Sequence, residues 1–332
     1  MESRADDPLK VTADLWDKTA EARAVQPVQG WMDSALVLES YVQPTITGSA
    51  TTNWLIGLAP RLEAPRGGHW LSLGCGAAGQ EIFAAQHGLF GSMDAFDASP
   101  QSIEQAKQAA AQQGIRSITF QSADLNHILL PERTYDVVMM NMSLHHVKRL
   151  RPLLTQIRRA LKPRGRLILN EFVGPRQFQF TDLQLGLVNE LLQALPVSLR
   201  QDCTTGAAKE TYLRLPVEHW NVADPSEAIR SDRIVPELTR QFRVIDRIDY
   251  GGTILNLLLE HIVHNFDAGN EKDAALVRIL GKFEETLIRH RVLPSDFTVI
   301  IAAPAPVPAR AARSLGRAVK KAWRAARDRK RP

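Results

Sequence analysis

Cysteine is scarce in this 332-residue chain, which contains only Cys75 and Cys203. Two thiols cannot form the disulfide framework of a small secreted scaffold, so that class is excluded. Long hydrophobic runs are also missing. The longest apolar stretches, 253–263 and 297–307, are interrupted by charged residues or prolines, and a membrane-spanning helix needs roughly 18 apolar residues. The charged N-terminus lacks the apolar core of a signal peptide, so we expect a cytoplasmic protein.

A large excess of charge is also lacking outside the C-terminal tail. The net charge is +5, but residues 309–332 contain ten Lys or Arg and a single acid, Asp328. The rest of the chain contains 31 basic and 35 acidic side chains, so the body of the protein is mildly acidic. A basic surface for nucleic acid is therefore not indicated, and we do not expect nucleic acid as a partner.

Between residues 69 and 172 the sequence has a regular alternation of short apolar segments and amphipathic segments. The apolar segments predict strands at 69–73, 93–96, 118–120, 135–141 and 166–170. The segments between them predict helices at 79–87, 100–113 and 150–161. Five strands that alternate with helices predict an α/β protein with a doubly wound, Rossmann-like sheet.

The chain on either side of this alternation is mainly helical. Residues 1–68 are expected to form an N-terminal helical segment, with helices at 12–23, 30–42 and 49–62, the last two separated at Pro44. The main domain is expected to extend over 69–302, with residues 303–332 forming a Pro-rich linker and a basic tail.

After Glu171 the regular alternation stops. Helical insertions at about 174–223 and 254–291 are expected to cover the open end of the sheet as a cap, and further strands are expected at 242–249 and 297–302. Asp224 has the pattern of a helix cap, followed by Pro225 at the first helical position and Glu227 three residues after the cap. This pattern predicts a helix from Asp224 to about Gln241.

A glycine-rich turn connects the first strand of the alternation to its first helix. Gly74, Gly76 and Gly79 lie in this turn, where glycine allows close approach of the backbone to a ligand; the alternative is a tight turn that simply needs glycine. Asp97 follows Gly79 by 18 residues, near the spacing at which an acid binds a ribose diol; alternatively, it caps the helix near Pro100. These two features fit both dinucleotides and S-adenosylmethionine.

The ends of the later strands separate these two ligands. Asp124 follows the third strand, Asn141-Met-Ser-Leu-His-His146 follows the fourth, and Leu161-Lys-Pro-Arg-Gly165 precedes the fifth. With the glycine turn and Asp97, this order resembles the class I S-adenosylmethionine-dependent methyltransferases over residues 69–172. Asp124 and the 161–165 turn argue against a nicotinamide dehydrogenase. The resemblance implies S-adenosyl-L-methionine as the cofactor and a seven-stranded sheet whose last strand is antiparallel.

The resemblance also implies which residues hold the cofactor. Gly74, Cys75 and Gly76 would line its methionine part, Asp97 its ribose and Asp124 its adenine, with Asn141 near the sulfonium and Gly79, Ala98 and Leu125 also at the site. Cys75 is expected to be a small filler, since no basic partner lies beside it in the sequence. One departure is Ser72, at the position where most members have an acid that helps to hold the cofactor's amino group.

Three side chains are candidates for the acid–base chemistry of transfer to a hydroxyl group. His145 and His146 follow the fourth strand at the predicted catalytic edge of the sheet, and a neutral imidazole suits proton abstraction near pH 7. Glu171, at the end of the fifth strand, is a second base or an orienting partner. The alternative is a purely structural histidine pair. No spacing makes a convincing metal site, so no metal is expected.

Further segments resemble a narrower subgroup of methyltransferases found beside polysaccharide glycosyltransferases. They are Leu71-Ser-Leu-Gly-Cys-Gly76, Asn170-Glu-Phe-Val-Gly-Pro-Arg176, Asp224-Pro-Ser-Glu-Ala-Ile-Arg230, Gly251-Gly-Thr253 and Ser295-Asp-Phe297. This resemblance implies O-methylation of a sugar hydroxyl on a glycolipid, oligosaccharide or surface polysaccharide. The alternatives are a small-molecule natural-product methyltransferase and a cofactor-binding scaffold without transfer activity. Candidate contacts to the acceptor are Arg176, Tyr212, His219, Trp220 and Arg230.

The basic tail has a pattern of its own. Apolar residues recur every three or four positions between Ala309 and Ala326, and Lys or Arg fill most of the remaining positions, with Trp323 among them. This predicts a basic amphipathic C-terminal helix over 309–331 that binds an anionic membrane surface peripherally, at the inner face of the membrane. The alternative is a disordered, solubilising tail.

Overall fold

A computed structural model of the chain describes residues 30–306, and these contain one seven-stranded sheet with the order β3-β2-β1-β4-β5-β7-β6. Five strands are parallel: β1 (His69–Leu73), β2 (Ser92–Asp97), β3 (Ile118–Ser122), β4 (Tyr135–Asn141) and β5 (Leu161–Phe172). The last strand, β7 (Phe297–Pro304), is antiparallel to both β5 and β6 (Phe242–Gly251). The predicted seven-stranded Rossmann-like sheet is confirmed.

Helices cover both faces of this sheet, which explains why β4 is a continuous apolar run. Val138 and Met140 pack on one face with α7 (Leu150–Ala160) and α10 (Ile234–Thr239). Val137 and Met139 point to the other face, where the N-terminal helices pack. The helices α5 (Gly79–Gln86) and α6 (Pro100–Gln112) pack against the β2 and β3 side of the sheet. Since successive residues of a strand face opposite ways, a strand covered on both sides needs apolar residues throughout.

The N-terminal segment is helical but is not divided where the sequence suggests. A continuous helical run consists of α2 (Ala35–Val37), the π-helical turn Leu38–Val42 and α3 (Gln43–Thr47). The break expected at Pro44 is therefore wrong. Pro44 lies inside this run, directly after the π-helical turn, and the run ends only at Gly48, with a φ of +79°. A second helix, α4 (Trp54–Leu58), continues into a 3-10 turn at Ala59–Leu62.

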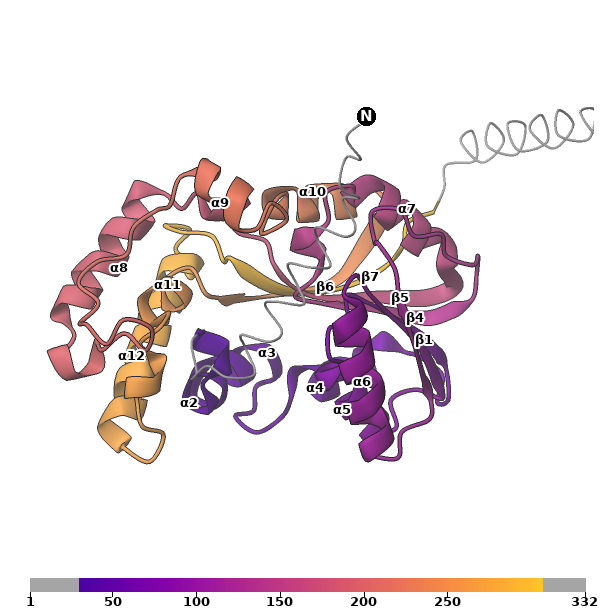
Figure 1. Cartoon of the computed structure of the whole chain (residues 1–332), viewed down its shortest axis with the longest axis horizontal. Coiled ribbons are helices and arrows are strands. Elements are labelled where there is room, and N and C mark those ends of the chain that lie inside the picture. Colours follow the sequence, from indigo (N-terminus) through magenta and orange to yellow (C-terminus); the bar gives the residue numbers. More distant parts are fainter. Residues whose placement is uncertain (1–29, 307–332) are drawn as a thin grey trace, which may run out of the picture.

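The expected cap regions contain four further α-helices, which gather toward one end of the sheet (Figure 1). They are α8 (Asp182–Ala194), α9 (Val217–Ala223), α11 (Leu255–Leu259) and α12 (Glu271–Arg289). Short 3-10 turns lie at Trp31–Asp33, Leu144–His146, Arg176–Phe178, Val197–Leu199, Ser231–Arg233 and Val263–Asn265.

The helix predicted from Asp224 to Gln241 is wrong for its first half. Residues 225–230 form turns, and α-helix begins only at Ile234. The Asp224 carboxylate accepts hydrogen bonds from the backbone N–H and hydroxyl of Ser226, which closes a tight turn. Ala228 then has a φ of +48°, a left-handed conformation that a right-handed helix cannot contain.

Within residues 30–306, no helix is both long enough and apolar enough to cross a membrane. The helix expected at 12–23 and the basic tail at 309–331 lie outside the described residues, so both stay predictions.

Candidate active site

A cavity of about 450 Å³ lies where β1, β2, β3 and β4 end. Its lining includes eight residues proposed to hold the cofactor: Gly74, Cys75, Gly76, Asp97, Ala98, Asp124, Leu125 and Asn141. The carboxyl ends of neighbouring parallel strands meet at one edge of a sheet, which brings these separate segments together. We refer to this space as the cofactor cavity.

The glycine turn shows which of its positions need glycine. Gly74 has a φ of +78°, and a Cβ there would lie 2.3 Å from the Cβ of Ser143. Gly76 has a φ of +51° and faces open space. The third left-handed residue is Ala78, at +61°, rather than Gly79. Gly79 begins α5 with nothing near its Cβ position and does not line the cavity, so its predicted place at the cofactor is not supported.

Asp97 organises the turn from the neighbouring strand. Its Oδ2 accepts a hydrogen bond from the N–H of Gly76 at 2.8 Å, and its Oδ1 accepts one from Ser99 at 2.9 Å. The helix cap is Ser99 itself, whose Oγ accepts from the N–H of Ser102. The carboxylate therefore fixes the turn against β2 while it lines the cavity.

Asp124 is held in a comparable way at the end of β3. Its Oδ1 accepts from the N–H of Asn126 at 2.8 Å, and its Oδ2 pairs with Nδ1 of His127 at 2.6 Å. Burial raises the pKa of Asp124, but the hydrogen bonds from Asn126 and His127 outweigh this, and the net pKa is lowered. The side chain is therefore an ionised acceptor at neutral pH.

Ser72 contacts Glu81, a buried acid that the sequence analysis did not identify as part of the site. Ser72 Oγ donates a hydrogen bond of 2.6 Å to Oε1 of Glu81, and both side chains are buried. Burial raises the pKa of Glu81 to about 7, against the effect of the bond from Ser72. A carboxyl group thus lies beside the turn although β1 has no acid, because α5 supplies it. Burial also raises the pKa of the Cys75 thiol far above its usual value, which supports an inert filler.

A second cavity of about 240 Å³ adjoins the first, and seven aromatic side chains line it: Trp31, Phe172, Phe178, Phe180, Tyr212, Trp220 and Phe297. The polar side chains in its lining are Asp33, His145, Glu227, Asn256 and Glu260. Met142 lines both cavities, and the neighbours His145 and His146 line one each. We refer to this second space as the aromatic cavity.

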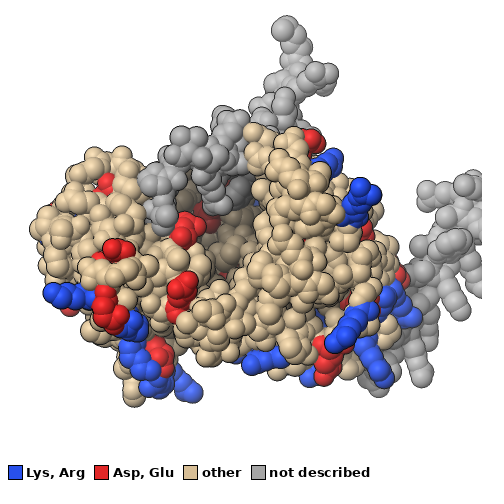
Figure 2. All heavy atoms as spheres, turned by 90° about the horizontal axis from the view of Figure 1, so that it is seen from below, with Lys and Arg blue, Asp and Glu red and all other residues tan. Residues whose placement is uncertain are grey.

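The proposed acceptor contacts separate into two groups. Tyr212 and Trp220 line the aromatic cavity, whereas Arg176, His219 and Arg230 do not. Arg230 instead donates to the carbonyl of Lys148 in a surface pocket with other basic residues. The indole N–H groups of Trp31 and Trp220 are buried and have no hydrogen-bond partner in the described part of the chain. On the view of Figure 2 the surface is hollowed near its middle, with acidic side chains beside the hollow.

Glu171 holds the loop that carries the two histidines. Its Oε1 pairs with Nδ1 of His145 and also accepts from the N–H of Phe172. Its Oε2 accepts from the N–H groups of Ser143, at 3.1 Å, and Leu144, at 2.6 Å. Both oxygens are hydrogen-bonded and the side chain is fully buried, contacts that fit the predicted orienting partner better than a second base.

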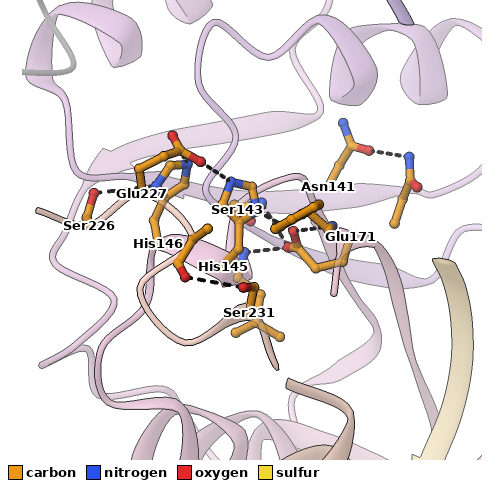
Figure 3. Close-up of polar contacts among 12 residues, drawn as sticks. Asn141, Ser143, His145, His146, Glu171, Ser226, Glu227 and Ser231 are labelled. Carbon is orange, nitrogen blue, oxygen red and sulfur yellow. Dashed lines mark hydrogen bonds and ion pairs between the residues drawn. The ribbon is translucent and has the colours of Figure 1, made fainter. Parts of the chain in front are cut away.

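The other ring nitrogens of the histidines face Glu227 (Figure 3). Nε2 of His145 lies 3.5 Å from Oε1 of Glu227, and Nε2 of His146 lies 3.9 Å from Oε2. Nδ1 of His146 lies 3.4 Å from Ser226 Oγ, and the two ring centres are 4.0 Å apart. Burial lowers the pKa of His145, but the carboxylates of Glu171 and Glu227 outweigh burial and raise it to about 8.

Residues 66–241, just over half of the chain, match the methyltransferase domain family. The chain belongs to the class I S-adenosylmethionine-dependent methyltransferases. Curated relatives of this methyltransferase include the demethylmenaquinone methyltransferase of Tropheryma whipplei, 26% identical over 172 residues, or 52% of this chain and 68% of the relative. The 27-O-demethylrifamycin SV methyltransferase of Amycolatopsis mediterranei is 28% identical over 145 residues, covering 43% and 49% of the two chains.

Two solved methyltransferase structures are similar to this chain over different shares of its length. The geranyl diphosphate C-methyltransferase of Streptomyces coelicolor has a TM-score of 0.49 and 12% identity, over 92% of this chain and 100% of the other. An S-adenosylmethionine-dependent methyltransferase of Mesorhizobium loti has a TM-score of 0.43 and 15% identity, over 76% and 97%.

The cofactor of this methyltransferase is S-adenosylmethionine, and the residues of the cofactor cavity fit it. The open space at Gly76 is a cradle that any Cβ would begin to fill. Asp97 and Asp124 supply carboxylate acceptors at the ends of β2 and β3, suited to hydroxyl and amine donors of a nucleoside. When bound, the cofactor supplies an electrophilic methyl group on a sulfonium.

Proposed function

We propose that this methyltransferase transfers the methyl group to a hydroxyl of a sugar, carried by a glycolipid, oligosaccharide or surface polysaccharide. The observation that carries the proposal is the aromatic cavity, which meets the cofactor cavity at Met142 and the two histidines. Aromatic faces pack on the C–H faces of a sugar ring, while carboxylate and amide groups accept its hydroxyl hydrogens.

The charges in the aromatic cavity support a neutral acceptor. Among the described residues its lining contains three carboxylates, Asp33, Glu227 and Glu260, and no Lys or Arg. A phosphate or uronate group placed there would meet like charge in a poorly solvated space, which is unfavourable. The transferred methyl would therefore go to an uncharged hydroxyl-bearing part of the acceptor.

The residues between the cavities have distinct tasks in this proposal. His146 takes the hydroxyl proton, since it lines the cavity proposed to hold the cofactor and is the neighbour of His145 in the aromatic cavity. His145 faces the aromatic cavity and is the second candidate for this role. Glu171 orients His145 and the loop before it. The aromatic side chains of the second cavity would cover an acceptor bound there and limit its contact with water.

A small-molecule natural product is the second candidate acceptor. The aromatic cavity also suits a planar polyketide or quinone, and two curated relatives are named for demethylmenaquinone and 27-O-demethylrifamycin SV. In both cases the cofactor half of the site has the same task. The two proposals differ only in what fills the aromatic cavity.

Methyl transfer from tritium-labelled S-adenosylmethionine to a panel of neutral oligosaccharides, quinones and aromatic polyketides tests the proposal. Label in a sugar ether supports it, and label only in a quinone or polyketide overturns it in favour of the second candidate. Binding of S-adenosylhomocysteine without transfer to any acceptor class would instead indicate a scaffold. In the His146→Ala variant we expect turnover to fall by roughly 10²- to 10⁴-fold while affinity for S-adenosylhomocysteine is retained.

A further inference from the structure

Three side chains with metal-binding chemistry meet between the two cavities. One ligand atom each from His145, His146 and Glu227 lie within 4.8 Å of one another. Both Nε2 atoms face the same carboxylate, at 3.5 and 3.9 Å. Ligands bound about 2.1 Å from one ion lie roughly 3.0–3.4 Å apart. The two pairs with Glu227, at 3.5 and 3.9 Å, are within about half an ångström of this range, and a pair at the 4.8 Å limit of the set would have to approach by about 1.4 Å.

The Nδ1 atom of each imidazole, which points away from Glu227, has an oxygen partner, as histidine ligands of metal centres do. Nδ1 of His145 is paired with the Glu171 carboxylate, and Nδ1 of His146 faces the hydroxyl of Ser226. A histidine that ligates a metal through one nitrogen almost always donates the other N–H to an oxygen. The same arrangement on two neighbouring histidines leaves both Nε2 atoms facing Glu227 (Figure 3).

The segments that carry these ligands are fixed before any ion binds. The 3-10 turn Leu144–His146 is anchored because Glu171 accepts backbone N–H groups from its start. On the other side, the Asp224 carboxylate closes the turn that carries Ser226 and Glu227. Such anchoring lowers the cost of organising the site, since the ligands need not be ordered by the ion.

We propose that His145, His146 and Glu227 bind one divalent transition-metal ion of the Zn²⁺, Co²⁺ or Mn²⁺ type. Two imidazoles and one carboxylate suit these ions, whereas Mg²⁺ and Ca²⁺ prefer sets made of oxygen alone. The side chains are mostly buried, with 6%, 16% and 22% of their surfaces exposed, so water would not fill the whole coordination sphere. His146 lines the cofactor cavity, and Glu227, next to Ser226 of that cavity, lines the aromatic cavity. The coordination positions that the three side chains leave open would therefore lie between the methyl donor and the acceptor.

The role of this ion rests on the proposed function. An ion between the cavities would bind the acceptor hydroxyl and lower its pKa, so His146 would act as a ligand of the ion and not as the base that it is in the metal-free proposal. The O–H bond breaks and its proton passes to water. The oxygen then forms a bond to the methyl carbon as the carbon–sulfur bond breaks, which gives a methyl ether and S-adenosylhomocysteine.

Cobalt titration of the full chain, after removal of bound metal with a chelator, tests the site without any acceptor. We expect one equivalent of Co²⁺ to bind, with visible absorption of a nitrogen- and oxygen-ligated ion. The isosteric Glu227→Gln variant should bind at least tenfold more weakly. Glu171→Gln, which weakens both the partner of His145 and the anchoring of the Leu144–His146 turn, should bind about 10- to 100-fold more weakly. His219→Ala is the matched control, because His219 is exposed on α9 and outside the cluster, and should bind like the wild type.

Affinity for S-adenosylhomocysteine, measured on each variant, shows whether the fold is intact. Wild-type protein that binds S-adenosylhomocysteine but no Co²⁺, or Glu227→Gln and His146→Ala variants that fold and bind Co²⁺ like the wild type, would overturn the metal site. If the protein methylates sugars equally well without metal, the proposed function stands and the ion's role is wrong. If Co²⁺ binds as expected but no acceptor is methylated, the site stands and the proposed function fails.

Discussion

The cofactor cavity and the aromatic cavity share Met142, but the first is lined mainly by loops at strand ends and the second by side chains from distant segments. Much of the cofactor cavity comes from short segments at the ends of four consecutive strands, 74–77, 97–98, 124–126 and 141–143. The aromatic cavity gathers side chains from the N-terminal turn at 30–33, from β5, from both cap regions and from β7. The cofactor cavity therefore depends on short loops that follow each strand. The aromatic cavity depends on how segments distant in the sequence pack together.

This difference changes what a substitution can do. In the cofactor cavity the backbone itself forms the wall, as at Gly74 and Gly76, so adding a single methyl group alters the site. In the aromatic cavity the walls are large side chains such as Trp220 and Phe178, which contact one another edge to face. Removing one of them enlarges the cavity without moving the sheet. The predictions below test this separation, from the largest expected effect to the smallest.

The Gly74→Ala variant should show the largest effect. Its new Cβ would lie 2.3 Å from Ser143 Cβ on a backbone at φ +78°, so the turn and the loop after β4 must separate. We expect affinity for S-adenosylhomocysteine, measured by calorimetry, to fall on the order of 100-fold, with a loss of about 2–3 kcal/mol in stability. Gly79→Ala is the control, since nothing lies near that Cβ position, and its affinity should stay close to that of the wild type. Equal losses in both variants would contradict this view of the turn.

The Asp97→Ala variant removes a carboxylate that lines the cofactor cavity and holds Gly76. Loss of one charge-assisted hydrogen bond costs about 1.5–3 kcal/mol, so we expect affinity for S-adenosylhomocysteine to fall by at least about 10- to 100-fold. Asp94, three residues earlier on β2, bonds to Tyr135 and His69 away from the cavity. Asp94→Ala should therefore leave this affinity unchanged, and a similar loss in both variants would show a general effect on β2.

The Trp220→Ala variant should affect the acceptor and spare the cofactor. The ring packs at 4.9 Å, centre to centre, against Phe178 in the wall of the aromatic cavity. We expect the KM for the acceptor to rise about tenfold while affinity for S-adenosylhomocysteine is retained, since tenfold corresponds to about 1.4 kcal/mol of lost contact. Val222→Ala, on the same helix but 87% exposed, is the matched control. A larger change in cofactor affinity than in KM would mean that the two cavities are not separable.

The smallest expected effect is on stability, and it comes from one buried carboxyl group near each of the two cavities. Burial raises the pKa of Asp296, which precedes Phe297 of the aromatic cavity, and of Glu81, which is bonded to Ser72 before the glycine turn, in each case to about 7. Both groups ionise near pH 4 in the unfolded chain, so the folded state holds more protons between about pH 4 and 7. The free energy of unfolding should therefore fall as pH rises through this window and change little above it.

Urea denaturation of the Asp296→Asn variant at pH 5 and pH 8 checks this dependence. The amide stays neutral, so we expect a smaller loss of stability between the two pH values, by on the order of 1 kcal/mol. Asp182→Asn, at an exposed side chain in the cap, should lose as much stability as the wild type. An Asp296→Asn variant with the full loss would show that this carboxyl group ionises freely in the folded protein.

Most residues of the cofactor cavity that carry a proposed role could be predicted from the sequence. Gly74, Asp97, Asp124 and Asn141 are all found at one cavity, because strand ends follow from local patterns and the carboxyl ends of parallel strands meet at one edge of the sheet. The carboxyl group beside Ser72 could not be found this way, since Glu81 comes from the next helix and the contact depends on how α5 packs. The misplaced start of α10 has a similar origin. The cap-like sequence at Asp224 fits a turn as well as a helix, and packing of the loop beside His146 selects the turn.

The alternation of strands and helices and the motifs at the strand ends are local patterns, and the family resemblance that they carry implied the seven-stranded sheet and the residues proposed to hold the cofactor. What lies opposite those residues depends on packing between distant segments. This packing brings Glu227 within 4 Å of two histidines about 80 residues earlier, and it joins Trp31 and Phe297 in one wall. No local pattern encodes such pairs, since their proximity arises from how the N-terminal segment, the cap and β7 pack on the edge of the sheet.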